Sequence, residues 1–238
     1  LLCGNSTVPE DIDRLMEGER AELMFTDPPY GVDYEGGHFN PYREKLKGDA
    51  SAEIYSQFLP LALRYVDGPC YLWFADSRGF DVYKSVIESG GEIHALIIWH
   101  KINATYAAMN AQYKQRHEPC LYFKPKGSTL RWIGPSDERT LWELKRDPRN
   151  ELHPTQKPIC LAERAIRNHS SKTVIDFFCG SGSTIIASES LNRKCYAIEI
   201  EPRYIDVAVK RWQNYTGKKG KNLTRPEVEI PKQEDNNR

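Results

Sequence analysis

The residues Asp27-Pro28-Pro29-Tyr30 follow the apolar run 21–26, and their types suit chemistry on an amino group. An exocyclic amino group of adenine or cytosine is a poor nucleophile, because its lone pair is delocalised into the ring. The Asp27 carboxylate and the Pro28 carbonyl could accept hydrogen bonds from such a group and favour a pyramidal, nucleophilic nitrogen. The prolines would stiffen the turn, and the Tyr30 ring could stack on a base flipped out of a duplex. A Pro-Pro turn that simply ends a strand is the alternative.

A second group of residues lies in 174-VIDFFCGSGSTIIAS-188, where a strand-like segment runs through Asp176 into a glycine turn and a helix-like segment. Gly180 and Gly182 allow close backbone approach, and the helix start beyond them offers free N–H groups. Glu199 ends the next strand-like run, roughly 20 residues after Gly180, where an acid can bind ribose hydroxyls. The unit predicts a nucleoside cofactor site, with a purely structural turn as the alternative.

The same unit favours one class of cofactor. A dinucleotide fingerprint has a further glycine where this chain has Ile185. Asp176 would repel a pyrophosphate, but it could accept a hydrogen bond from an ammonium group. S-adenosylmethionine has an α-amino group and a ribose but no phosphate, so it fits both observations better than a nicotinamide dinucleotide does.

With a third motif, 153-HPTQKP-158, the chain resembles the amino-methylating DNA methyltransferases. Their (D/N/S)PP(Y/F/W), DxFxGxGxT and HxTxKP motifs correspond to 27-DPPY-30, 176-DFFCGSGST-184 and 153–158. The catalytic motif comes first and the cofactor motif last, as in the family's β group, and the resemblance covers residues 1–216. Phe177 departs from the family's usual proline, which should alter local stiffness more than chemistry.

The resemblance implies a doubly wound α/β fold: a mostly parallel, seven-stranded Rossmann-like sheet with helices on both faces. It implies one methyltransferase domain over residues 1–216 and a polar tail over 217–238. Residues 124–152 would form a short target-recognition insertion, and 116–126 would help to close the target pocket.

The resemblance also implies site residues. The catalytic residues would be Asp27, Pro28, Pro29 and Tyr30. The cofactor-binding residues would be Asp176, Phe178, Gly180, Ser181, Gly182, Ser183, Thr184, Glu199, Thr155 and Lys157. Asn5 and Ser6 could touch the adenine moiety of the cofactor by the same analogy. No metal site is predicted, because a sulfonium donor is already activated.

The predicted activity is transfer of a methyl group from S-adenosylmethionine to the N6 amino group of adenine in DNA. Aspartate at the first motif position favours adenine, and the N4 amino group of cytosine is the alternative. RNA and protein-amide methyltransferases also use a PP-aromatic turn, but the protein enzymes place the cofactor motif first. A binding module without catalysis would be expected to lose Asp27 or Tyr30, and both are present.

The elements that must position these residues alternate along the chain, which favours an α/β domain. Strand-like runs span 21–26, 69–75, 93–99, 172–178 and 194–200, and helical spacing is seen at 51–66, 77–89, 158–170, 182–192 and 202–215. Residues 31–50 look like a loop that could cover the base, and 124–153 look like an irregular insertion.

Composition sets the broad class. The 238 residues carry 33 basic and 33 acidic side chains, and basic tracts at 114–149 and 201–226 could meet the phosphates of double-stranded DNA. The six cysteines form no close pair, so reduced thiols and a cytoplasmic location are expected. A homodimer is a further possibility, because the recognition insertion is short.

Overall fold

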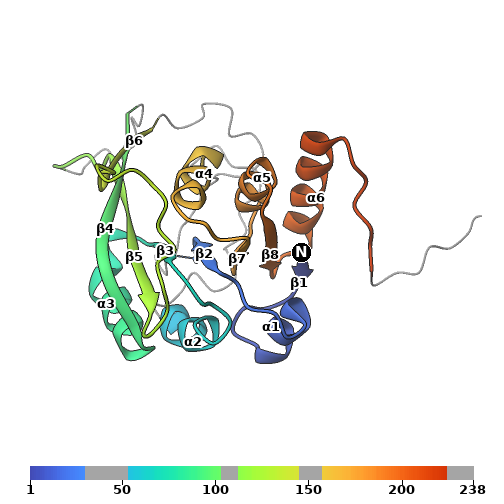
Figure 1. The fold of residues 1–238 in the computed structure, drawn as a ribbon, viewed down its shortest axis with the longest axis horizontal. Helices are drawn as coiled ribbons and strands as arrows, with labels where there is room; N and C mark the ends of the chain where they lie inside the picture. Colours follow the sequence, from blue (N-terminus) through green and yellow to red (C-terminus); the bar gives the residue numbers. More distant parts are fainter. Residues whose placement is uncertain (30–52, 103–111, 145–156, 224–238) are drawn as a thin grey trace, which may run out of the picture.

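The computed structural model describes residues 1–29, 53–102, 112–144 and 157–223 (Figure 1). Its strands are β1 Leu2–Cys3, β2 Leu23–Thr26, β3 Cys70–Trp73, β4 Gly91–Lys101, β5 His117–Pro125, β6 Leu141–Leu144, β7 Thr173–Asp176 and β8 Lys194–Glu199. Its helices are α1 Pro9–Met16, α2 Glu53–Ala62, α3 Gly79–Glu88, α4 Ile159–Arg167, α5 Ser183–Ser190 and α6 Pro202–Thr216, with the 3-10 turn η1 Asp76–Arg78. No helix within these ranges is both long and apolar enough to cross a bilayer.

The described strands form one sheet in the order β1-β8-β7-β2-β3-β5-β4-β6. Strand β5 pairs antiparallel with β3 and β4, and the other pairings are parallel. The predicted doubly wound, mostly parallel α/β fold is therefore confirmed. The predicted strand number is corrected from seven to eight, because short strands extend the sheet beyond β8 and beyond β4.

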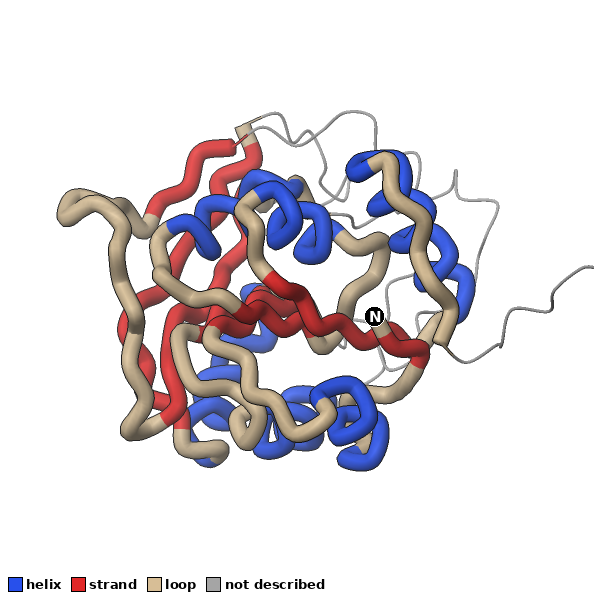
Figure 2. The backbone as a smooth tube through the Cα atoms, turned by 45° about the vertical axis from the view of Figure 1, so that its right-hand side comes forward, coloured by secondary structure: helices blue, strands red, loops and turns tan. Residues whose placement is uncertain are grey.

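Helices cover both faces of this sheet. In Figure 1, α1, α2 and α3 lie on one side of the strands and α4, α5 and α6 on the other. The tube in Figure 2 shows the same layering from a second direction. Leu23 and Met24 of β2 point to opposite faces and both are fully buried, in separate apolar clusters. Burial on both faces explains why the central strands are continuous apolar runs.

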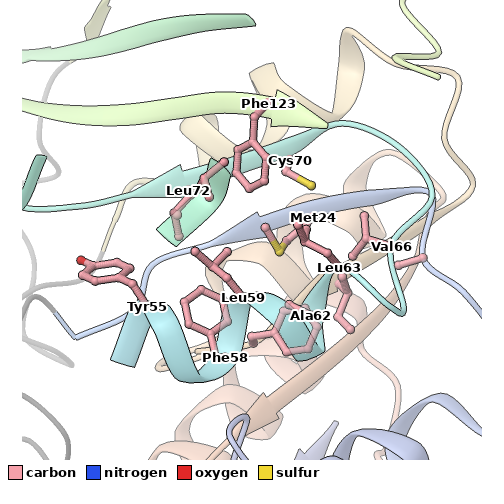
Figure 3. Packing of buried hydrophobic residues seen from close by; sticks show 14 of the residues in the cluster. Met24, Tyr55, Phe58, Leu59, Ala62, Leu63, Val66, Cys70, Leu72 and Phe123 are labelled. Atoms are coloured by element: carbon pink, nitrogen blue, oxygen red, sulfur yellow. The ribbon is translucent and has the colours of Figure 1, made fainter. Parts of the chain in front are cut away.

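The first apolar cluster lies between the sheet and α2. Phe58 and Leu59 of α2 pack toward Met24 of β2 and Leu72 of β3, and Phe123 of β5 closes the group (Figure 3). All are essentially buried, and each large apolar side chain contributes about 1.5–3 kcal/mol on burial. The cluster holds α2 in position against β2, the strand that leads to Asp27.

The connection pattern places a topological switch point between β2 and β7. These strands are parallel neighbours, yet α2, the next described helix after β2, and α5, the next after β7, cover opposite faces (Figure 1). In open α/β sheets, ligands bind outside the carboxyl ends of the strands at such a point.

Parts of the segment 124–144 are more regular than predicted. Residues 124 and 125 end β5, and 141–144 form β6 along β4. Trp142 is 1% exposed and packs in the second apolar cluster. The prediction of an irregular insertion is therefore wrong for these residues, because an apolar Trp in a basic tract serves the core. Residues 145–153 lie outside the described ranges.

Candidate functional site

The carboxyl ends of β2 and β7 are joined by a buried hydroxyl. The Thr26 Oγ1 donates a hydrogen bond to Asp176 Oδ1 at 2.9 Å. The Thr26 Oγ1 also accepts a hydrogen bond from the Phe177 amide, at 3.1 Å. Thr26 is fully buried, so a direct, buried hydrogen bond holds together two motifs that lie about 150 residues apart in the chain.

Asp176 is a buried carboxylate with several partners. Its Oδ1 also accepts from the Phe178 amide at 3.1 Å, and its Oδ2 accepts from Thr184 Oγ1 at 2.6 Å. Burial raises the pKa of Asp176 to about 6, although these hydrogen bonds favour its charged form. A carboxylate has about four acceptor sites, so a further donor such as an ammonium group can still be accommodated.

The glycine turn after β7 has two positions with positive φ and different surroundings. At Gly182, where φ is +82°, an added Cβ would lie 2.9 Å from the Cβ of Ala208 in α6. At Gly180, where φ is +50°, an added Cβ would meet no heavy atom within 4 Å. Gly182 is therefore needed for close packing of α6 on the turn, whereas Gly180 leaves one side of the backbone open.

The predicted serines of this turn are engaged within the protein. Ser181 Oγ accepts a hydrogen bond from Arg211 of α6 at 2.8 Å. Ser183 Oγ donates one to the Lys157 carbonyl at 3.0 Å. The first of these bonds ties the turn to α6, and the second ties it to the segment before α4.

Glu199, at the end of β8, faces the same turn. Its Oε2 accepts from the Gly180 amide at 2.7 Å and its Oε1 from the Glu201 amide at 2.9 Å. Burial raises the pKa of this carboxyl. The Gly4 amide donates to the Glu199 carbonyl at 3.0 Å, which places the segment containing Asn5 next to the end of β8.

Asp27 is bound to a buried lysine. Lys157 Nζ lies 2.6 Å from Asp27 Oδ2 and 2.9 Å from Glu118 Oε2, and Lys101 pairs with the other Glu118 oxygen. Lys157 Nζ also lies 5.2 Å from the centroid of the Trp73 ring. Lys157 was predicted to lie near the cofactor, and the described contacts of its ammonium are with carboxylates of β5 and of the turn after β2.

The charges of this cluster support one another. Burial alone would lower the pKa of Lys157, but Asp27 and Glu118 outweigh it and leave that pKa above its usual range. Burial would likewise raise the pKa of Glu118, but Lys157 and Lys101 bring it down to about 2. The acidic and basic side chains alternate in the order Asp27, Lys157, Glu118 and Lys101.

The structure thus brings most of the predicted site residues to one edge of the sheet. Phe178 points its ring edge-on to Phe58 of α2, at a centroid distance of 5.0 Å. The predicted Tyr30 and Thr155, and the loop at 31–50, lie outside the described residues.

Thr26, Glu118 and Lys101 were missed from the sequence. Thr26 was passed over as part of an apolar run, although a hydroxyl at the end of a buried strand is a usable signal. Glu118 lies in the tract 116–126, which was predicted to help close the target pocket, but no role was predicted for Glu118 itself.

An α/β sheet with a glycine turn, a strand-end acid and an aspartate at the switch point is typical of enzymes that bind a nucleoside cofactor. The N6/N4 DNA methylase family model matches residues 21–210. The chain therefore belongs to the DNA methylase family of N6 and N4 amino-methyltransferases.

Individual proteins agree with this placement. The Type II methyltransferase M.HinfI of Haemophilus influenzae is 25% identical over 242 residues, covering 83% of this chain and 64% of that relative. The chain thus spans just under two thirds of that protein's length. The crystal structure of the M1.HpyAVI–SAM complex has a TM-score of 0.67 at 24% identity, covering 88% of this chain and 98% of that one. The cytosine-N4-specific PvuII DNA methyltransferase has a TM-score of 0.70 at 18% identity, covering 88% and 84%. These two structures share the fold.

Proposed function

We propose that this protein transfers a methyl group from S-adenosylmethionine to an exocyclic amino nitrogen of a base in double-stranded DNA. The observation that carries the proposal is the direct link between the two motifs, in which Thr26 hydrogen-bonds Asp176 across neighbouring strands. This link sets the Asp27 turn beside the glycine turn. The family of the chain and the named activity of M.HinfI support the same reaction.

The residues at the switch point fit the cofactor. Gly180 leaves room for close approach, Glu199 offers a carboxylate to ribose hydroxyls, and Asp176 can accept one more hydrogen bond, from the α-ammonium group. When bound, S-adenosylmethionine supplies a methyl group already activated by its sulfonium charge. Phe178, Thr184 and the turn serines hold this side of the site in shape. Thr155, which the resemblance also places there, belongs to the same proposal.

The chain's own part in the reaction centres on the turn after β2. Asp27 and the Pro28 carbonyl accept hydrogen bonds from the amino group of a flipped base, which frees its lone pair to attack. Pro29 stiffens the turn, and the Tyr30 ring stacks on the base. As the nitrogen–carbon bond forms, the carbon–sulfur bond breaks with its electron pair on sulfur, and one amino proton leaves to solvent.

Adenine N6 is the proposed target, with cytosine N4 as the second candidate. Aspartate at position 27 favours adenine among proteins with this motif, and it serves a cytosine amino group by the same hydrogen-bond geometry. The PvuII enzyme, which is cytosine-N4-specific, has a similar fold, so the distinction must come from residues around the base.

The test uses labelled S-adenosylmethionine and unmethylated duplex DNA, followed by digestion to nucleosides and mass identification. Label in N6-methyladenine is the expected result. Label in N4-methylcytosine would change the proposed target from adenine N6 to cytosine N4. Absence of label from DNA, together with transfer to RNA or protein substrates supplied in parallel, would overturn the proposal. Gel filtration with and without a short duplex examines the proposed homodimer, which a strict monomer on DNA contradicts.

A further inference from the structure

We propose that Lys157 is a positioning residue for Asp27, and that Glu118 and Lys101 hold Lys157 in place for this task. The inference rests on the proposed function, because its purpose is to keep Asp27 an ionised and correctly aimed hydrogen-bond acceptor. Lys157 thereby acts on the base through Asp27, and it does not itself contact the reacting atoms.

The four charges lie along one edge of the sheet in the order of its strands. Asp27 follows β2, and Lys101 is the last residue of β4. Glu118 is near the start of β5, which runs antiparallel to its neighbours β3 and β4 and so begins at the edge where they end. Lys157 precedes α4 and reaches over this edge to join Asp27 to Glu118.

The geometry makes Lys157 a bridge with two anchors. Its Nζ is 2.6 Å from Asp27 Oδ2 and 2.9 Å from Glu118 Oε2, and its side chain is only 8% exposed. The indole of Trp73, at the end of β3, supplies a ring face 5.2 Å from the same nitrogen. An ammonium attracted by two carboxylates and an aromatic ring has little freedom to move.

The bridge determines what Asp27 can do. An ammonium at hydrogen-bond distance stabilises the ionised carboxylate. A carboxylate has about four acceptor sites, and the role proposed for Asp27 uses one of them to accept a hydrogen bond from an amino group of a base. A carboxylate stabilised in this way is a weak base. This matches a role for Asp27 as a hydrogen-bond acceptor rather than as a general base that removes a proton during methyl transfer.

Glu118 is the second carboxylate that holds the Lys157 ammonium in place. Its pKa of about 2, set by Lys157 and Lys101 against the effect of burial, means that it keeps its charge at any working pH. The cluster has two charges of each sign, so it adds no net charge beside a nitrogen that becomes positive during the reaction. Lys101 completes that balance.

The primary test titrates the Asp27 carboxyl by carbon NMR in the full chain, with Asp27→Asn used to assign the signal. In Lys157→Met the pKa of Asp27 should rise by at least about 1 unit, because the nearby opposite charge is lost. Lys157→Arg, which keeps a cation, should restore the wild-type titration. The control is Lys124→Met, at the other end of β5, where the ion pair is with Glu92 and the Asp27 titration should not change.

Kinetics supply the second measurement. Lys157→Met should lower kcat on duplex DNA at neutral pH by about tenfold or more, move the acid limb of the kcat profile upward with the Asp27 pKa, and leave cofactor affinity within about threefold. If Lys157→Met does not fold, Lys157→Met with Glu118→Gln removes one charge of each sign and is titrated in its place.

The outcomes separate the two proposals. An unchanged Asp27 titration in the folded variant overturns the role of Lys157, whatever the activity. An unchanged kcat and pH profile in a variant whose Asp27 titration has moved also overturns it. Wild-type protein that places no methyl group in DNA sinks the proposed function, while the titration still reports on the ion bridge by itself.

Discussion

Replacement of the buried carboxylate Asp176 by Asn should change how stability depends on pH. Burial raises the pKa of Asp176 from 3.8 to about 6 in the folded protein. The folded state therefore binds this proton more tightly than the unfolded chain does. The resulting stability is fully present below pH 3.8 and is lost as pH rises through about 6. A shift of about 2 units corresponds to about 3 kcal/mol.

The Asn variant lacks this titration but keeps a carbonyl oxygen for the Thr26 and Phe178 donors. Its free energy of unfolding, measured by urea denaturation at pH 4, 5, 6 and 7, should rise relative to wild type by about 2 kcal/mol across the series, because part of the effect lies below pH 4. Other titrating groups contribute equally to both proteins and cancel in the difference. Two parallel stability profiles would refute the reasoning, because Asp176 would then be ionised at no cost.

Three further changes test the site. Asp27→Ala should lower turnover by on the order of a hundredfold while S-adenosylmethionine binding, measured by calorimetry, is kept; retained turnover would contradict the role of Asp27. Gly182→Ala should destabilise the fold by about 1–3 kcal/mol, because its Cβ would meet Ala208. Gly180→Ala should instead lower cofactor affinity more than it lowers stability. Equal losses of unfolding free energy in the two variants would argue against these separate roles. Glu199→Ala should weaken cofactor binding by about tenfold or more and abolish the preference for the cofactor over its 2′-deoxy analogue; a preserved preference would exclude a ribose contact.

From the sequence, both site motifs could be assigned to the carboxyl ends of strands in a mostly parallel sheet. Parallel strands share a direction, so they present these ends at the same edge. Asp27 and Asp176 each follow a buried apolar run, and the carboxyl ends of parallel strands meet at one edge. In the structure, β2 and β7 are parallel neighbours. The glycine turn, too, is visible in the sequence, since Gly180 and Gly182 take backbone angles that other residues rarely adopt.

The remaining features depended on tertiary pairing, which leaves no local pattern. Two residues suffice for β1 because Leu2 and Cys3 pair with β8. Strand β6 has only four residues, and its Trp142 packs in a core built from distant segments. Neither has the length over which periodicity can be recognised.

The single antiparallel strand among those described explains why Glu118 escaped notice. In a parallel sheet, polar residues at the ligand-binding edge lie at the carboxyl ends of the strands, as Asp27, Asp176 and Glu199 do. An antiparallel strand delivers to that edge the residues at its start, and β5 begins at His117. Once β5 is placed beside β3, Glu118 must lie near the end of β3, within reach of the lysine that bridges it to Asp27. The direction of one strand therefore decides which acidic residue completes the charge cluster at the turn after β2.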